Sequence, residues 1–248
     1  MSKVMIVTGA SRGIGAATAK LAASRGFAVC VNYNSHAQEA QSVVDEIRSN
    51  GGTAIAVKAD VTIADQVNHL FTETMKSFGG LHALVNNAGI LETQMRLEDM
   101  SSERIQRIFN ANVLSTILCI QAAIKIMSTR HQGSGGSIVN VSSVASRLGS
   151  PGEYVDYAAS KGAIDTLTIG LAKELAIDGI RVNAVRPGYI DTDIHASGGE
   201  PNRIERVKQF VPMKRGGTAA EVASAIVWLA SEESSYTSAS FIEVAGGN

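Results

Sequence analysis

The sequence has few cysteines, little excess charge and no long apolar run, and each absence argues against a class of protein. Only Cys30 and Cys119 are cysteines among its 248 residues, and both lie in apolar stretches. This fits reduced, buried thiols better than a disulfide framework, so we expect a cytoplasmic protein. A net charge of −1 and a hydrophobic fraction of 45% argue against disorder and against nucleic acid as a partner.

Membrane and metal sites are not indicated either. No apolar run reaches about 18 residues, the length that a membrane-spanning helix needs. The chain enters an apolar strand almost at once, which leaves no room for a secretory signal. The five histidines show no paired metal-ligand spacing. We therefore expect no membrane partner and no metal, at His195 or elsewhere.

What the sequence does contain is an alternation of short apolar runs with longer amphipathic stretches. Several of these stretches end in glycine, as at Gly26, Gly79 and Gly179, and glycine commonly closes a helix. The alternation predicts an α/β fold, a parallel sheet covered by helices on both faces, and the length suits one domain, 1–248. We expect seven strands, near residues 4–7, 28–32, 54–58, 82–86, 137–141, 181–185 and 240–244.

A glycine-rich loop follows the first expected strand. Its spacing, from Gly9 to Gly15, is Gly-x-x-x-Gly-x-Gly, and a helix-prone stretch continues to Arg25. Glycine lets the backbone approach a ligand, and a helix start offers unpaired amides to a phosphate, so we predict a dinucleotide site over a plain turn. Its residues in this loop are Gly9, Ser11, Arg12, Gly13, Ile14 and Gly15.

The end of the second strand indicates which nucleotide binds. An acid is expected there when the site holds NAD(H), but this sequence has Asn34 and Ser35 and no acid nearby. Arg12 in the glycine loop offers a partner for a ribose phosphate, unless it is only a solvated arginine. We therefore predict NADP(H) as the preferred cofactor, with NAD(H) as the alternative.

Two further segments follow expected strands, where ligands of such sheets bind. Asp60 and Val61 come after the third strand, where the acid either meets the adenine edge or caps the next helix. Asn87, Ala88 and Gly89 come after the fourth strand and are small enough to let the backbone approach the cofactor, although a simple turn has the same composition.

Tyr157 and Lys161 are four residues apart, so on a helix they share one face. A tyrosine titrates near about 10, and a neighbouring cation would lower that pKa and allow proton exchange at neutral pH. We expect Lys161 to do this, although two unrelated surface residues could show the same spacing. Ser143 follows the fifth strand, where a serine either faces the same cleft or serves the fold.

Together these segments resemble the short-chain dehydrogenase/reductase family over essentially the whole chain, and in particular the branch of β-ketoacyl carrier-protein reductases and glucose dehydrogenases. The resemblance implies a Rossmann-type, doubly wound subunit, usually of a homotetramer. The apolar stretches 105–127 and 158–177 are candidates for subunit pairing. The motifs that carry the family resemblance are the loop 8–15, Asn86 to Gly89, Asn112, Ser143, Tyr157, Lys161 and Pro187-Gly188.

The resemblance also implies roles for single residues. Tyr157 is the general acid and base, and Ser143 fixes the substrate oxygen. Lys161 binds the nicotinamide ribose, and Asn112 holds a water that relays protons. Tyr157 and Lys161 would contact the nicotinamide end of the cofactor. So would the segment after the sixth strand, at Pro187, Gly188, Ile190 and Thr192. A simple proline-glycine turn is the alternative explanation of that segment.

The substrate is not readable from the sequence. Ser143 precedes Tyr157 by fourteen residues, one more than is common in the family, which leaves Ser142 as a weaker candidate. Residues 189–215 are expected to form a lid, and they contain no arginine cluster built for a carboxylate or phosphate. We expect an oxidoreductase acting on a small carbonyl or alcohol. The alternatives are a non-catalytic NADP(H) sensor or scaffold, and a family epimerase or dehydratase.

Overall fold

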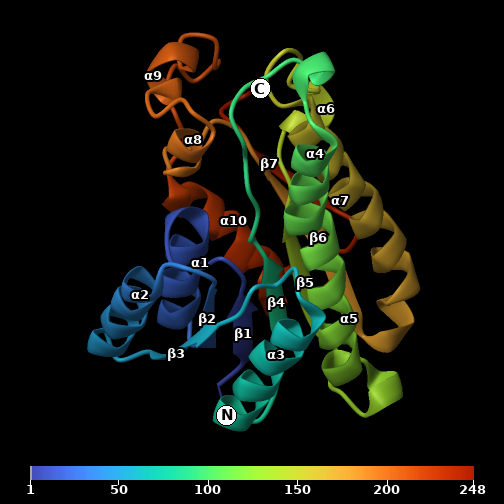
Figure 1. Ribbon diagram of the computed structural model, residues 1–248. Coiled ribbons are helices and arrows are strands. Elements are labelled where there is room, and N and C mark those ends of the chain that lie inside the picture. The colour runs from blue at the N-terminus through green and yellow to red at the C-terminus, as the bar shows by residue number, and fades with distance from the viewer. Residues whose placement is uncertain (1) are drawn as a thin grey trace.

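A computed structural model describes residues 2–248 and contains one seven-stranded sheet (Figure 1). Its strand order is β3-β2-β1-β4-β5-β6-β7, and every neighbouring pair is parallel. The expected α/β fold with seven parallel strands is confirmed. The strands are β1 Val4–Val7, β2 Ala28–Tyr33, β3 Thr53–Lys58, β4 Ala83–Asn86, β5 Gly136–Val141, β6 Ile180–Pro187 and β7 Phe241–Val244.

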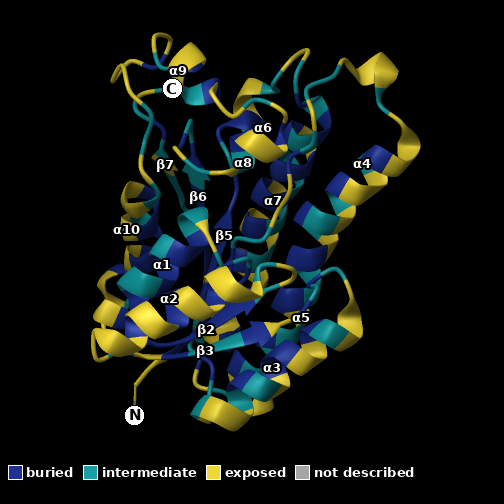
Figure 2. Ribbon diagram, turned by 60° about the vertical axis from the view of Figure 1, so that its left-hand side comes forward, coloured by how far each residue is buried: buried dark blue, intermediate teal, exposed yellow. Residues whose placement is uncertain are grey.

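Helices cover both faces of the sheet, and Figure 2 shows the buried strands between them. The central strand β1 is buried along its whole length, because parallel strands pack helices on both sides and need apolar residues at every position. One face carries α1 Gly13–Ser24, α2 Ala37–Ser49 and α10 Ala219–Ala230. The other carries α3 Ala64–Phe78, α5 Ser115–Met127 and α7 Val155–Glu174.

Shorter helices connect these elements. The segment before α5 contains α4 Ser102–Phe109 and a π-helix, Asn110–Leu114. The region beyond β5 and β6 contains α6 Ala145–Leu148, α8 Ile194–Ser197 and α9 Arg203–Val207. Single 3-10 turns lie at Leu97–Asp99, Thr129–His131, Ala176–Asp178 and Glu232–Ser234.

The order of the strands positions the functional site. The chain passes from β1 outward to β3 and then returns to place β4 on the other side of β1. At such a reversal the loops after the two central strands diverge and leave a crevice beyond their carboxyl ends. Where they leave the sheet, the loops after β1 and β4 are still in contact: the Asn87 side-chain amide donates to the carbonyls of Thr8 and Gly9 at 2.9 and 3.0 Å.

The stretch Ser102–Met127 is long and apolar enough, by length and composition, to cross a membrane, with a mean hydropathy of 1.4 in its most apolar window. It comprises α4, the π-helix and α5. One side of α5 contributes Cys119, Ile120 and Ala123 to the core between the sheet and the helices. The stretch is therefore a covering helix of the sheet in this fold, and its other side is partly exposed.

Candidate active site

The glycine-rich loop has a backbone that only glycine fits at two points. Gly9 has a φ of +60°, and a Cβ there would lie 3.0 Å from the Cα of Ala88. A Cβ on Gly15 would lie 2.5 Å from the carbonyl oxygen of Gly9. The loop therefore packs tightly and presents the first N–H groups of α1 to the crevice, which is the arrangement that a nucleotide phosphate requires.

A groove of about 480 Å³ runs along these loops at the carboxyl ends of the strands. Gly15 lies behind the groove, where it allows the close packing just described. Asn32 also lines the groove and was not predicted; its side chain accepts from Gly9 N–H and donates to the Ala59 carbonyl, which joins two loops. The predicted residues that line the groove are Gly9, Ser11, Arg12, Gly13, Ile14, Asn34, Ser35, Asp60, Val61, Asn87, Ala88, Gly89 and Thr192.

Asp60 does not cap the following helix. One carboxylate oxygen accepts from the backbone N–H and hydroxyl of Thr62 at 2.9 and 2.7 Å, and the other accepts from the Asn34 amide at 3.2 Å. Helix α3 begins only after Ile63. The acid therefore shapes the edge of the groove by closing a turn and fixing Asn34.

Arg12 stands at the mouth of the groove with 44% of its side chain exposed. Its nearest acidic partner is Asp193, at 3.9 Å, and that carboxylate is itself 69% exposed. An exposed ion pair of this kind contributes about 0–1 kcal/mol, so it does not hold the Arg12 side chain in place. The guanidinium can therefore pair with an anion in the groove.

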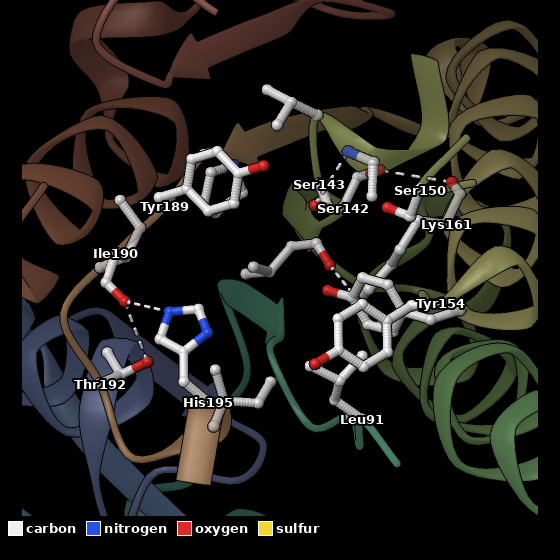
Figure 3. A pocket seen from close by; sticks show the side chains of 18 of the residues that line it. Leu91, Ser142, Ser143, Ser150, Tyr154, Lys161, Tyr189, Ile190, Thr192 and His195 are labelled. Carbon is white, nitrogen blue, oxygen red and sulfur yellow. Dashed lines mark hydrogen bonds between the residues drawn. The ribbon is translucent and has the colours of Figure 1, made fainter. Parts of the chain in front are cut away.

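A second, smaller cavity of about 150 Å³ adjoins the groove (Figure 3). The residues that line both are Ile14, Asn87, Gly89, Leu91, Thr192 and Ile194. The smaller cavity brings together residues from the ends of β5 and β6 and from α7. The predicted residues that line it are Ser143, Tyr157, Lys161, Pro187, Gly188, Ile190 and Thr192, and the alternative Ser142 lies in its wall as well.

The two serines at the end of β5 have different environments. The Ser142 hydroxyl is buried and donates to the carboxylate of Asp165 at 2.6 Å. The Ser143 hydroxyl accepts from the Ala145 N–H at 3.1 Å and lines the same cavity as Tyr157. Both serines line the cavity, but the Ser142 hydroxyl is already bound to a buried carboxylate. The geometry favours Ser143 over Ser142 as the serine of the site.

The pKa of Tyr157 is raised in this structure, opposite to the direction expected beside Lys161. Burial raises the pKa of Tyr157 to about 12, and the hydrogen bond with Ser143 opposes this only in part. The Lys161 ammonium lies 5.6 Å from the centre of the phenol ring and donates to the Val141 carbonyl at 2.8 Å. Burial also lowers the pKa of Lys161 to about 8, although Asp165 raises it. Desolvation outweighs the attraction between the two groups.

Asn112 lies in the π-helix and is almost fully buried. Its amide donates to the Ile90 carbonyl and the Ser160 hydroxyl, both at 3.1 Å, and its oxygen accepts from Ile90 N–H at 2.8 Å. Short π-helical turns within a longer helix are frequent at functional sites. The side chain has little capacity left for a water, so its predicted relay role stays a prediction, and the contacts themselves fix the segment that follows β4.

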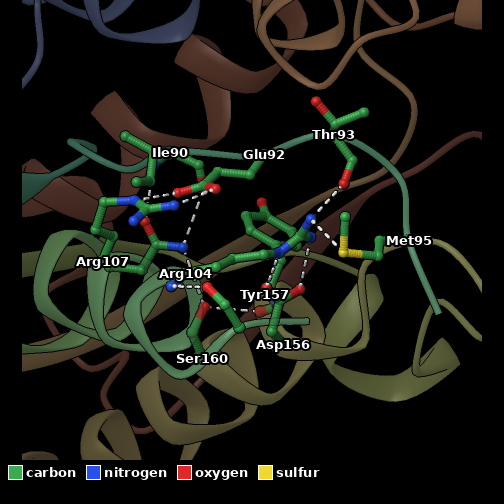
Figure 4. A network of polar contacts seen from close by, with 11 residues as sticks. Ile90, Glu92, Thr93, Met95, Arg104, Arg107, Asp156, Tyr157 and Ser160 are labelled. Atoms are coloured by element: carbon green, nitrogen blue, oxygen red, sulfur yellow. Dashed lines mark hydrogen bonds and ion pairs between the residues drawn. The ribbon is translucent and has the colours of Figure 1, made fainter. Parts of the chain in front are cut away.

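A buried ion pair lies behind Tyr157 (Figure 4). Arg104 donates to the two carboxylate oxygens of Asp156 at 2.8 and 3.3 Å, and the two side chains are 5% and 1% exposed. Asp156 also accepts from the Tyr157 N–H at 2.9 Å, while Arg104 donates to the Thr93 carbonyl at 2.5 Å. The pair joins α4, the start of α7 and the segment after β4, and thereby fixes the backbone that carries the phenol.

The far side of the cavity includes part of the segment 189–215, which was expected to form a lid, together with residues that the sequence did not single out. Tyr154 donates through its hydroxyl to the Gly198 carbonyl at 3.2 Å, which ties α7 to the segment after β6. That segment contains α8 and α9. Among residues 2–248 no group of three or more His, Cys, Asp or Glu is arranged to hold a metal. The unexpected lining residues are Leu91, Val144, Leu148, Ser150, Tyr154, Tyr189, Ile194, His195 and Arg203.

Comparison with known proteins identifies the family. A family model described as enoyl-(acyl carrier protein) reductase matches residues 9–248. The chain belongs to the short-chain dehydrogenase/reductase family. It is 57% identical over 244 residues to the oxidoreductase YgfF of Escherichia coli, covering 98% of this chain and 99% of that protein. It is 41% identical to the 3-oxoacyl-[acyl-carrier-protein] reductase of a Synechocystis species, covering 99% of this chain and 96% of that protein.

A solved structure has the same short-chain dehydrogenase/reductase fold. The chain superposes on a short-chain type dehydrogenase/reductase from Mycobacterium marinum with a TM-score of 0.93 and 36% identity. The match covers 99% of this chain and 94% of that one. The protein is therefore an oxidoreductase of the short-chain dehydrogenase/reductase family, folded as a single sheet with its two adjoining cavities at the strand carboxyl ends.

Proposed function

We propose that the protein is an NADP(H)-dependent oxidoreductase that interconverts a small carbonyl compound and its alcohol, with Tyr157 as general acid and base. The supporting observation is that Ser143, Tyr157 and Lys161 line one cavity, which adjoins the glycine-lined groove. The groove accepts the nucleotide and the cavity accepts the substrate. Hydride transfer itself is the chemistry that the nicotinamide supplies when bound.

The protonation of the site suits the reductive direction. With its pKa raised to about 12, Tyr157 keeps its proton at neutral pH and can give it to a carbonyl oxygen as negative charge develops there. Ser143 donates a hydrogen bond to the same oxygen and fixes its position. Lys161, buried in the same cavity, stabilises the phenolate that remains, and it binds the nicotinamide ribose.

The cofactor preference depends on the end of the groove near Arg12. The weakly paired guanidinium, together with Asn34 and Ser35, suits the additional phosphate of NADP(H). Asp60 and Val61 border the adenine, and Asn87 to Gly89 border the middle of the nucleotide. Pro187, Gly188, Ile190 and Thr192 border the nicotinamide.

The setting of the enzyme is part of the proposal. We place the enzyme in the cytoplasm, with a small-molecule substrate and no membrane or nucleic-acid partner, in line with its near-zero net charge. Leu114, directly before α5, is 40% exposed, and Ile169 on α7 is 41% exposed. These apolar positions support a homotetramer in which such helices pair between subunits.

The test is NADPH oxidation against a panel of ketones, diketones, ketoacyl thioesters and aldoses. We expect turnover by the wild-type protein, and a loss of about 10²–10⁴-fold in Tyr157→Phe with NADPH binding retained. Turnover that survives Tyr157→Phe would overturn the mechanism. NADPH binding without turnover of any substrate would favour the sensor or scaffold. Conversion of a substrate without net NADPH oxidation would indicate the epimerase or dehydratase.

A further inference from the structure

Two buried polar side chains reach the small cavity from the segment after β6. His195 on α8 is 8% exposed and Arg203 on α9 is 5% exposed, and both line the cavity that holds Tyr157. Each carries one nitrogen without a hydrogen-bond partner. Because an unpaired buried polar group costs about 1–3 kcal/mol, two of them in one substrate cavity indicate a ligand that pairs with both.

The free nitrogen of His195 is a hydrogen-bond acceptor. Its Nε2 lies 2.8 Å from the carbonyl oxygen of Ile190, and because a carbonyl only accepts, Nε2 carries the proton. Nδ1 is therefore the bare nitrogen, and Figure 3 shows it turned from Ile190 toward the cavity. Burial, and secondarily the charge of Arg203, lowers the pKa of His195, which keeps the ring neutral.

The free nitrogen of Arg203 is a hydrogen-bond donor. Its Nη2 donates to Glu153 at 2.5 Å, whereas the nearest carboxylate oxygen to Nη1 is that of Glu200 at 3.6 Å, beyond a hydrogen bond. The guanidinium lies 4.7 Å from the ring centre of Tyr154 and 5.5 Å from that of Tyr189. These rings and Glu153 hold the side chain in one position.

The charges around Arg203 are balanced. Arg206 donates to Glu200 at 2.7 Å and to Glu153 at 3.2 Å. With Arg203, the group therefore contains two arginines and two glutamates. A carboxylate or phosphate placed against Arg203 would add a third negative charge to this balanced group. A neutral group that accepts one hydrogen bond and donates another is the better match, and a hydroxyl does both.

The cavity also limits size. Its volume is about 150 Å³, and Leu91, Val144 and Leu148 contribute apolar walls. We propose that the enzyme selects short, neutral carbonyl compounds bearing a hydroxyl near the carbonyl, as in hydroxyketones, with that hydroxyl donating to His195 Nδ1 and accepting from Arg203 Nη1. The proposal rests on the proposed function, because the carbonyl itself is assigned to Tyr157 and Ser143.

The test compares three ketones of similar size. NADPH oxidation is measured with 3-hydroxy-2-butanone, with 2-butanone, which lacks the hydroxyl, and with pyruvate, which carries a charge instead. We expect kcat/KM to be at least about tenfold higher for the hydroxyketone than for either of the others, because the others leave buried groups unpaired. Equal or reversed values for 3-hydroxy-2-butanone and 2-butanone would overturn the proposal.

Variants assign the preference to the two side chains. In His195→Leu the ratio of kcat/KM between the hydroxyketone and 2-butanone should fall to near one, whereas His195→Gln, which keeps a donor and an acceptor, should retain part of it. Arg203→Lys should also lower the ratio. His69→Leu, on the exposed side of α3, is the matched control and should keep it. An unchanged ratio in His195→Leu would contradict the assignment.

A binding measurement separates this proposal from the proposed function. Saturation-transfer NMR on the protein loaded with NADP⁺ should show tighter binding of 3-hydroxy-2-butanone than of 2-butanone, and His195→Leu should remove the difference. Melting temperatures report whether each variant is folded. If no ketone is turned over, the proposed redox function is wrong. The difference in binding between the two ketones then still tests the proposed preference for hydroxyketones. Equal binding of the two ketones would overturn the selectivity alone.

Discussion

The two walls of the small cavity differ in how their polar groups are satisfied. On the wall built from β5 and α7, Ser143 accepts from the Ala145 N–H, and Lys161 donates to the Val141 carbonyl and lies beside the Tyr157 ring. On the wall built from residues 189–215, His195 and Arg203 keep unpaired nitrogens. The difference indicates a division of labour, in which the first wall fixes the reacting atoms and the second is completed by the substrate.

The largest effect should come from the serines of the first wall. Ser143→Ala removes a hydrogen bond to the reacting oxygen and should lower turnover by about 10²–10³-fold. Ser142→Ala instead removes a hydrogen bond to Asp165 and should cost about 1–3 kcal/mol of stability with little change in turnover. Steady-state kinetics and urea unfolding distinguish the two. A larger loss of turnover in Ser142→Ala would reverse the assignment.

The buried pair behind Tyr157 should dominate the rigidity of this wall. Breaking it in Asp156→Leu leaves the Arg104 charge buried and unpaired, and should cost about 3–5 kcal/mol in the free energy of unfolding. The control is Arg96→Gln, whose pair with Glu98 is exposed and should contribute about 1 kcal/mol or less. Similar losses in the two variants would mean that the buried pair has no special role.

A pH profile tests the protonation of the first wall. Lys161, with its pKa lowered to about 8, loses its charge before Tyr157, whose pKa is raised to about 12. The rate of reduction should therefore be level up to about pH 8 and then fall about tenfold per pH unit. Lys161→Arg keeps the charge at higher pH and should move the decline upward. A decline below pH 7 would contradict this order of ionisation.

The smallest effect is expected at the mouth of the groove. Arg12→Ala should raise the KM for NADPH about tenfold and leave the KM for NADH nearly unchanged, because only NADPH carries the extra phosphate. Arg25→Ala, at the exposed end of α1, is the matched control. Equal changes in the two Michaelis constants would remove the cofactor assignment.

The sequence predicted the sheet and the first wall because both depend on local patterns. Apolar runs mark the buried strands, and the spacing of Tyr157 and Lys161 places them on one face of α7. Neighbouring serines are harder to distinguish. Which of the Ser142 and Ser143 hydroxyls is free to bind a substrate depends on its partners, and the contact of Ser142 with Asp165 is seen only in three dimensions.

The sequence predicted a lid over residues 189–215 but not which of its residues face the cavity, because these meet other segments only through the path of a long loop. Glu153 comes from the loop before α7, whereas Arg203 lies fifty residues later, and no spacing rule connects them. The pKa of Tyr157 was mispredicted for a related reason. A helical spacing shows that a cation is near, but not that burial outweighs it.

The most direct measurement is a crystal structure of the protein with NADP⁺ and 3-hydroxy-2-butanone. We expect the nucleotide along the loop from Gly9 to Gly15, and the carbonyl oxygen within hydrogen-bond distance of both the Tyr157 and Ser143 hydroxyls. A carbonyl oxygen bound away from Tyr157, or a nucleotide outside this groove, would contradict this expectation.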